Sequence, residues 1–321
     1  MSIERFHSTD GPAAAVAAYR ERHAASAPLL ACSGGPDSLA LLLAAAQAGV
    51  PGLAVCHVDH RLRPGGAREA AFVRKVALVA GVPRARVRAV RVAQDLRVVA
   101  RRGGRSLEEV AREARYRALA RAARALGCSE VWTGHNATDQ VETLLLHLLR
   151  GAGTVGLAGM RERGEVLGVM VGRPLLTCAR VAIEADLLAQ GVTALVDPTN
   201  SDPRHHRNHV RHHIVPALRS LTPALEVVVG RACQNLADDA EALDSLAAGL
   251  PLTAAALLAA PRALRYRALA RAARAAGVAL ETVHLAAIEG LCRRRRGGAG
   301  VDLPGGRVLY RQGVVSFVKR S

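Results

Sequence analysis

Residues 33–38 read Ser-Gly-Gly-Pro-Asp-Ser and stand between an apolar run, Leu29 to Cys32, and a helical pattern from Ser38 to Ala48. Glycines let the backbone approach an oxyanion closely, the hydroxyls of Ser33 and Ser38 can donate hydrogen bonds, and the amides at a helix N-terminus favour negative charge. This placement predicts a phosphate-binding loop between a strand and a helix. It is not a Walker A loop, because the lysine of that motif is absent. For a bare Ser-Gly-Gly, an ordinary capped turn would be the better interpretation.

The alternation of short apolar runs and longer helical patterns continues beyond this loop. Further strands are expected at Leu53 to Val58, Val87 to Val92 and Val131 to Thr133, and helices at Ala67 to Ala80, Ser106 to Leu126 and Thr138 to Leu149. Because the strands are nearly continuous apolar runs, we expect both faces of the sheet to be covered. The predicted fold class is α/β, with an open, mainly parallel sheet and helices on both faces.

The pattern changes after Pro216 and is then helical through Leu291. This change predicts two domains, residues 1–216 with the sheet and residues 217–321 as a smaller, mainly helical domain.

Two local patterns stand out in the C-terminal part. The tail has turn signals at residues 304–306 and 312–313, which predict a C-terminal β-hairpin. The string RYRALARAARA occurs at residues 115–125 and again at residues 265–275. No longer repeat accompanies it, so we interpret it as coincidence in two Ala/Arg-rich helices.

Composition limits the partners of the chain. The formal net charge of +17 and the pI near 11.1 predict a polyanionic partner, because clustered cations release counterions from phosphates. Aromatic residues make up only 2% of the chain, so a base-stacking platform for single strands is not expected to dominate. The basic run Arg293 to Arg296 either contacts RNA or is a solvated loop.

The six cysteines contain no C-x-x-C pair, so neither a zinc site nor a disulfide framework is expected. The first residues mix both charge signs, and no apolar stretch reaches the ~20 residues of a membrane span. We therefore expect a cytoplasmic protein with no membrane partner.

Two further segments carry candidate ligand contacts. His57 and His60 lie at the end of the second expected strand, where nucleotides bind in open α/β sheets, although an exposed polar loop is the alternative. Glu108, Arg112 and Arg115 share one helix face, either as a surface ion-pair ladder or as part of a site.

The segment TGHNATDQVET at residues 133–143 leaves a short strand and enters a helix. Asp139 and Glu142 lie one turn apart there, and His135 precedes them. Such carboxylates can hold magnesium through their oxygens or bind an ammonium group. Helix capping is the alternative.

An ordered series of strings extends from Leu29 to Leu218: SGGPDS, HVDHRLR, EEVAREARY, GHNATDQVET, RGAGTVGLAGM, RPLL, DPTN and RNHVRHHIVPAL. The first resembles the pyrophosphate loop of N-type ATP pyrophosphatases, and the whole series resembles the tRNA(Ile)-lysidine synthase family. The resemblance implies an ATP site made of Ser33, Gly34, Gly35, Pro36, Asp37 and Ser38 with His57 and His60; catalytic roles for Asp139, Arg112, Arg207 and Asp37; lysine contacts from His135, Asp139 and Glu142; and magnesium on Asp37 and Asp139.

The family's reaction joins free L-lysine to carbon 2 of the wobble cytidine of tRNA(Ile) with a CAU anticodon, through an adenylated cytidine, and releases AMP and pyrophosphate. By the same resemblance, residues 1–216 are the catalytic domain and residues 217–321 bind tRNA. The oligomeric state is open, with a homodimer as one expectation. Two alternatives are ATP-dependent tRNA thiolation by a related pyrophosphatase, which commonly needs a C-x-x-C site, and a non-catalytic RNA-binding protein on the same scaffold.

Overall fold

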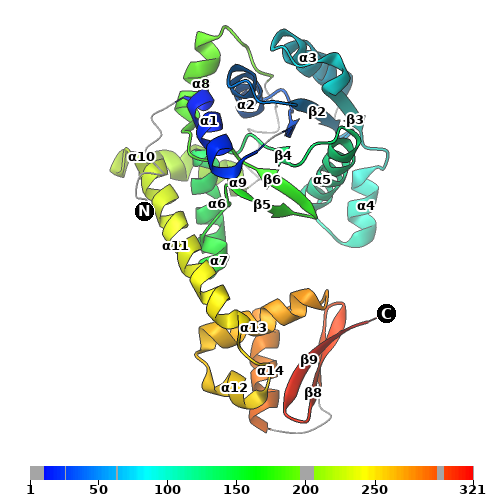
Figure 1. Ribbon diagram of the computed structural model, residues 1–321, viewed down its shortest axis with the longest axis vertical. Helices are drawn as coiled ribbons and strands as arrows, with labels where there is room; N and C mark the ends of the chain where they lie inside the picture. The colour runs from blue at the N-terminus through cyan, green and yellow to red at the C-terminus, as the bar shows by residue number, and fades with distance from the viewer. Residues whose placement is uncertain (1–10, 26, 63, 196–205, 295–299, 321) are drawn as a thin grey trace. The chain divides into compact units, whose positions relative to one another are not determined.

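The computed structural model describes residues 11–25, 27–62, 64–195, 206–294 and 300–320 (Figure 1). The string DPTN and the residues Arg63, Arg295 and Arg296 lie outside these ranges. The chain divides into two compact units, with the division after Gln234. This point lies inside helix α11 (Leu225–Ala248), later than the change of pattern after Pro216, and the separate roles of the two parts stay a prediction.

A six-stranded sheet with the order β3-β2-β1-β4-β6-β5 forms the centre of the first unit (Figure 1). The strands are β1 (Leu29–Ala31), β2 (Ala54–Asp59), β3 (Val87–Arg91), β4 (Val131–Trp132), β5 (Arg163–Val166) and β6 (Val169–Gly172). All neighbours pair in parallel except β5, which pairs antiparallel with β6. The expected open, mainly parallel sheet is confirmed. The β5–β6 hairpin was not expected, because its strands are short and β5 is only half-buried.

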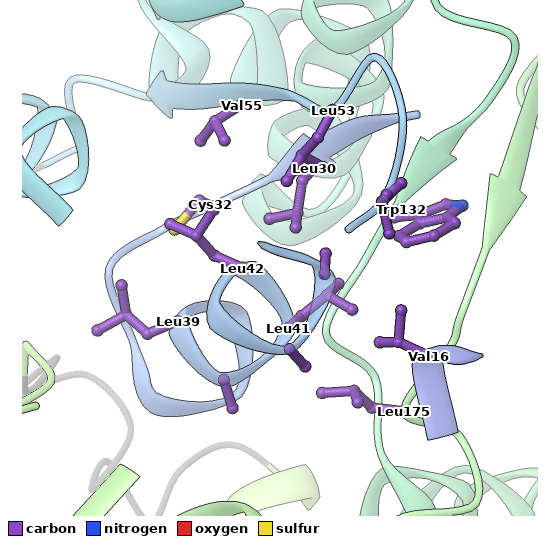
Figure 2. Close-up of a cluster of buried hydrophobic side chains, with 14 of the residues drawn as sticks. Val16, Leu30, Cys32, Leu39, Leu41, Leu42, Leu53, Val55, Trp132 and Leu175 are labelled. Carbon is purple, nitrogen blue, oxygen red and sulfur yellow. The ribbon is translucent and has the colours of Figure 1, made fainter. Parts of the chain in front are cut away.

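Side chains of successive strand residues enter two different cores, as the two-residue period of a strand requires. Leu30 and Val55 pack on one face with Leu39 and other side chains of α2, as Figure 2 shows. Leu29 belongs to the core of the opposite face, together with Leu119 of α5. The first face is covered by α1 (Pro12–His23), α2 (Pro36–Gln47), α3 (Gly66–Val79) and α8 (Arg180–Ala189), and the second by α5 (Leu107–Ala125).

The remaining elements of the first unit connect these layers or follow them. They are η2 (Arg84–Arg86), α4 (Leu96–Gly103), α6 (Ala137–Leu149), α7 (Thr154–Leu157), α9 (His206–His209), the π-helix η4 (Val210–Ile214) and α10 (Val215–Leu221). The starts of α5 and α6 are specified locally, since Ser106 and Asn136 accept a hydrogen bond from the backbone three residues on.

The second unit has its own core, in which Leu257, Leu269, Ile288 and Val308 are almost fully buried. It contains α12 (Ala254–Ala259), α13 (Arg262–Ala275), α14 (Thr282–Arg294) and the strands β7 (Gly300–Leu303), β8 (Gly306–Arg311) and β9 (Val314–Lys319). The strands form an antiparallel sheet that turns at both expected positions, so the predicted hairpin is the larger part of a three-stranded sheet. None of the helices described here has both the length and the apolar character needed to cross a bilayer.

Candidate active site

Polar side chains gather where β2, β1 and β4 end, at the carboxyl edge of the sheet. Because β1 lies between β2 and β4, the connections leave it in both directions along the sheet. Ligands of open α/β sheets bind at such a switch point. A cavity of about 570 Å³ lies there, lined by residues that follow each of these strands. Its size suits a nucleotide together with part of a second substrate.

The loop that follows β1 is shaped by its own hydroxyl groups. Ser33 N donates to Ser38 Oγ over 3.2 Å, and Ser38 Oγ donates to Gly35 O over 3.0 Å. These bonds hold the loop in a tight turn, and its residues Ser33 and Gly35 to Ser38 line the cavity.

Glycine is required at position 34. Its φ is +89°, and a Cβ atom would stand 2.8 Å from Leu195 Cδ1. Helix α2 then begins at Pro36 with no side-chain cap on its first amides. Such amides can hold a phosphate, because they have no partner within the helix.

The loop after β4 reaches the start of α2 through a second glycine. A Cβ atom at Gly134 would stand 2.7 Å from Asp37 O, so only glycine permits this approach. Asn136 Nδ2 donates to Asp37 Oδ1 over 2.9 Å, while Asn136 and Asp139 form a reciprocal capping box at the start of α6. Asn136 therefore connects the two aspartates. Sequence reasoning did not assign it a role.

Two arginines cover the carboxylates of α6. Glu142 is fully buried; its Oε1 accepts from Arg211 Nε over 2.6 Å and its Oε2 accepts from Arg207 Nε over 2.7 Å. Asp139 Oδ1 accepts from Arg211 Nη2 over 3.0 Å and from Arg207 Nη2 over 3.3 Å. The predicted residues Asp139, Glu142 and Arg207 thus form one cluster. Arg211 was missed, although it stands four residues after Arg207 and so on the same helical face.

Asp37 is half-buried at the edge of this cluster. Burial raises the pKa of its carboxyl group above the usual value, and the charge of Asp139 adds to this effect. Arg180, the hydrogen bond from Asn136 and Arg211 act in the opposite direction. Arg180 and Arg211 both line the cavity, so positive charge stands beside the two aspartates at the loop end of the site.

His57, near the end of β2, and His60, directly after it, both lie in the cavity wall. His57 is 2% exposed; its Nδ1 donates to Cys32 O over 3.0 Å, and its Nε2 is buried without a hydrogen-bond partner among the described residues. Burial and the charge of Arg115 lower the pKa of His60 to about 4. His60 is therefore uncharged at neutral pH.

His135, at the end of β4, lies close to several positive charges. Its Nδ1 is 2.8 Å from Thr133 Oγ1. Burial is the largest cause that lowers its pKa to about 3, followed by the charges of Arg173, Arg207, Arg112 and Arg115. His135 is neutral at any physiological pH, and can accept or donate a hydrogen bond without adding charge.

The helix face predicted from Glu108, Arg112 and Arg115 only partly faces the cavity. Arg115 and Tyr116 line it, whereas the Arg112 guanidinium lies over the Tyr116 ring, 5.1 Å from its centre, outside the lining.

No group of three or more His, Cys, Asp or Glu side chains within the described ranges could hold a metal ion by itself. Asp37 and Asp139 lie close enough for the charge of one to raise the pKa of the other. Magnesium usually binds one or two carboxylates together with substrate phosphates, so this pair fits a magnesium ion that arrives with a nucleotide.

Comparisons with known proteins agree with this geometry. Residues 12–218 match the family model of the PP-loop domain, and residues 252–315 match that of the TilS substrate binding domain. The tRNA(Ile)-lysidine synthase of Salinispora tropica is 41% identical over 90% of each chain. That of Thermus thermophilus is 39% identical over 94% of this chain, which spans 59% of the longer relative.

Among solved structures, the U34-tRNA thiolase NcsA from Methanococcus maripaludis has the same fold, with a TM-score of 0.56 over 70% of this chain and 78% of its own. Its sequence identity is 16%, so this likeness concerns the fold alone.

Proposed function

Because this chain belongs to the tRNA(Ile)-lysidine synthase family, we propose that it uses ATP to couple free L-lysine to carbon 2 of the wobble cytidine of tRNA(Ile) with a CAU anticodon. The observation that best supports this proposal is the connection made by Asn136. It joins Asp37 at the phosphate loop to Asp139 in the arginine-covered cluster, so nucleotide and second substrate share one continuous site.

The first step transfers the adenylyl group. Oxygen 2 of the cytidine attacks the α-phosphorus of ATP, the bond to the β-phosphate oxygen breaks, and pyrophosphate leaves. The Ser33 hydroxyl and the amides at the start of α2 would hold the phosphates, while Arg180 and Arg211 offset the developing negative charge. His57 Nε2 makes no hydrogen bond among the described residues and lies 3.9 Å from Glu69 Oε2, so it can donate to or accept from the nucleotide.

Magnesium would be held by Asp37 and Asp139 and would neutralise phosphate charge when bound. Asp37 binds a cation best when ionised, and Arg180 with Asn136 favours that form. Asp139 also holds Arg211, so it positions a guanidinium as well.

In the second step the lysine ε-amine attacks carbon 2, the bond from carbon 2 to the adenylated oxygen breaks, and AMP leaves with that oxygen. The amine loses a proton as its bond forms. Neutral His135 can accept a hydrogen bond from that amine, which is why we retain it as a lysine contact. Glu142 has both oxygens occupied by Arg207 and Arg211, so its contribution to lysine binding requires one of these arginines to move.

The direct test incubates the protein with tRNA(Ile), ATP, magnesium and labelled lysine, followed by digestion of the tRNA. We expect a lysine-bearing nucleoside and one AMP for each lysine incorporated. Methionine tRNA with the same anticodon serves as the control substrate. AMP release without lysine incorporation would contradict the proposal.

The thiolation alternative is disfavoured by the cysteines. All are free, and five of the six are buried at separate places in the two units. Their thiols are poor nucleophiles where burial raises the pKa, as for Cys32 beside the phosphate loop, to about 11. A non-catalytic RNA-binding protein would not need a phosphate loop, carboxylates and arginines around one cavity, so this alternative is also disfavoured.

The remaining parts of the proposal concern assembly and location. A tRNA substrate implies a cytoplasmic enzyme. A homodimer is tested by light scattering, since the monomer has a mass of 33.7 kDa.

A further inference from the structure

Thr133 carries a buried hydroxyl group directly after β4, at the carboxyl edge of the sheet. The residue is 9% exposed; its Oγ1 lies 2.8 Å from His135 Nδ1 and 3.4 Å from Gly172 O. Both Thr133 and His135 line the cavity. The hydroxyl therefore joins the backbone of the sheet to a side chain that can meet a substrate.

The carbonyl group of Gly172 is a rigid anchor for this hydroxyl. It accepts a hydrogen bond from Thr133 N over 3.0 Å, which extends the pairing of β4 with β6 by one residue. The Gly172 backbone also packs closely on a buried ring, since a Cβ atom there would stand 2.8 Å from Trp132 Cδ1. The position of the Thr133 hydroxyl is thus determined by the sheet.

The backbone on both sides of His135 is held as well. Gly134 approaches the start of α2 so closely that a Cβ atom there would stand 2.7 Å from Asp37 O, and Asn136 caps α6. The freedom that remains to His135 is the rotation of its ring and the choice of the nitrogen that carries the proton. The contact of Thr133 with Nδ1 restricts both.

The imidazole ring of His135 carries a single proton at neutral pH, because burial and neighbouring arginine charges lower its pKa to about 3. In a neutral ring, the partner of one nitrogen decides whether the other donates or accepts. Gly172 O can only accept. If the Thr133 hydroxyl donates to Gly172 O, its oxygen is free to accept from Nδ1–H, and both contacts become hydrogen bonds. If the hydroxyl donated to Nδ1 instead, only one of the two would form.

We propose that Thr133 is a positioning residue that keeps the ring proton of His135 on Nδ1 and so leaves Nε2 as a hydrogen-bond acceptor for the lysine side chain. This inference rests on the proposed function, in which His135 contacts lysine. A lysine ammonium group has only N–H donors, and the free amine must direct its lone pair at carbon 2 of the cytidine. In both forms a neighbouring acceptor is favourable, whereas an N–H at Nε2 would face another N–H.

Thr133→Val tests this role, because valine keeps the branched shape of the side chain and lacks the hydroxyl. The KM for lysine should rise about tenfold, while the KM for ATP stays within about twofold. Thr133→Ser keeps a hydroxyl and should have a KM for lysine within about twofold of the unmodified protein. Thr253→Val is the matched control: the Thr253 hydroxyl caps α12 in the second unit, so its loss should lower the Tm and leave the KM for lysine unchanged.

A second measurement locates the proton directly and needs no turnover. In NMR spectra of protein with isotope-labelled histidine, a ring nitrogen gives different signals with and without its proton, and the signals of His135 are those missing from His135→Asn. At neutral pH we expect the proton on Nδ1 in the unmodified protein and in Thr133→Ser. In Thr133→Val a large share of the molecules should carry it on Nε2.

A proton on Nε2 in the unmodified protein would overturn the proposal without any variant. An unchanged KM for lysine in Thr133→Val would also overturn it, as would equal increases in the KM for lysine and for ATP, which indicate a general distortion of the site. The same loss in Thr133→Ser as in Thr133→Val would show that the hydroxyl is not responsible. If the unmodified protein formed no lysidine, the proposed function would fail, while the NMR comparison would still test whether Thr133 places the proton.

Discussion

Replacement of Asp139 by asparagine should reduce both stability and activity, although aspartate and asparagine are comparable helix caps. Asp139 uses its two oxygens for different partners. Oδ1 accepts from Arg207 and Arg211, and Oδ2 accepts from the backbone N–H of Asn136. Asparagine has one oxygen, so its amide group must face one of these donors.

The magnitude follows from the burial of this group, which is 8% exposed. A buried donor left without its acceptor costs about 1–3 kcal/mol. At about 2–4 °C per kcal/mol for a chain of this size, the Tm should fall by roughly 2–12 °C. Arg211 then keeps only Glu142 as a charged partner, and the negative charge beside Asp37 is lost. Lysidine formation should therefore fall about a hundredfold, or ~2.7 kcal/mol of transition-state stabilisation.

Asp95→Asn is the matched control. Asp95 caps α4 away from the cavity, and the same oxygen, Oδ1, accepts from both Arg97 N and Val98 N. Asparagine can therefore keep both bonds, and we expect almost no change in Tm. Thermal unfolding and the lysine-incorporation assay are measured on both variants. Equal small losses of stability with nearly normal turnover in Asp139→Asn would refute the reasoning and leave capping as the role of this residue.

Three further outcomes are expected. In Gly134→Ala the new Cβ would lie 2.7 Å from Asp37 O and should push the loop after β4 away from the start of α2. The KM for ATP should therefore rise more than the KM for tRNA, and equal increases in both would contradict this. Folded His135 has a pKa of about 3, whereas an unfolded histidine has a pKa of about 6.5. Between about pH 6.5 and about 4 the unfolded chain therefore binds a proton that the folded chain does not, and the free energy of unfolding should fall as the pH is lowered. His135→Asn should make this dependence shallower when unfolding by denaturant is measured across this pH range. A fragment of residues 1–234 should unfold cooperatively and bind ATP, but its affinity for tRNA should be reduced. A fragment of residues 1–216 lacks the start of α11, which packs on α6, so calorimetry should show that it is less stable than the longer fragment.

Much of the fold was predictable because its signals are local. Each expected strand of the parallel sheet lies within a residue of an observed one, since a buried strand between two turns reads as an apolar run in the sequence itself. The hairpin β5–β6 gave no such signal. Strand β5 contains the charged residues Arg163 and Glu165, and β6 has only four residues, which is too short for a clear strand pattern. Only pairing with β4 places β6 in the sheet.

The candidate site was predictable where its chemistry is contiguous. Ser33 to Ser38 form strand end, loop and helix start within one short string, so their role follows from neighbouring residues. Asn136 and Arg211 could not be assigned in the same way. Asn136 binds Asp37, 99 residues away along the chain, and Arg211 binds Glu142, 69 residues away. Hydrogen bonds at such separations leave no local pattern.

The string RYRALARAARA, which occurs at residues 115–125 and 265–275, separates the features that local sequence determines from those that tertiary structure determines. In both copies the chain forms a helix and an arginine lies over the tyrosine four residues on, Arg112 over Tyr116 at 5.1 Å and Arg262 over Tyr266 at 5.0 Å. These features depend on helical geometry, which the local sequence determines. The local sequence does not determine the partner of the first arginine of the string. Arg265 forms an ion pair with Glu289 of another helix, whereas Arg115 lines the cavity. An ion pair needs a partner that only the folding of distant segments can bring within reach, so identical strings acquired different roles.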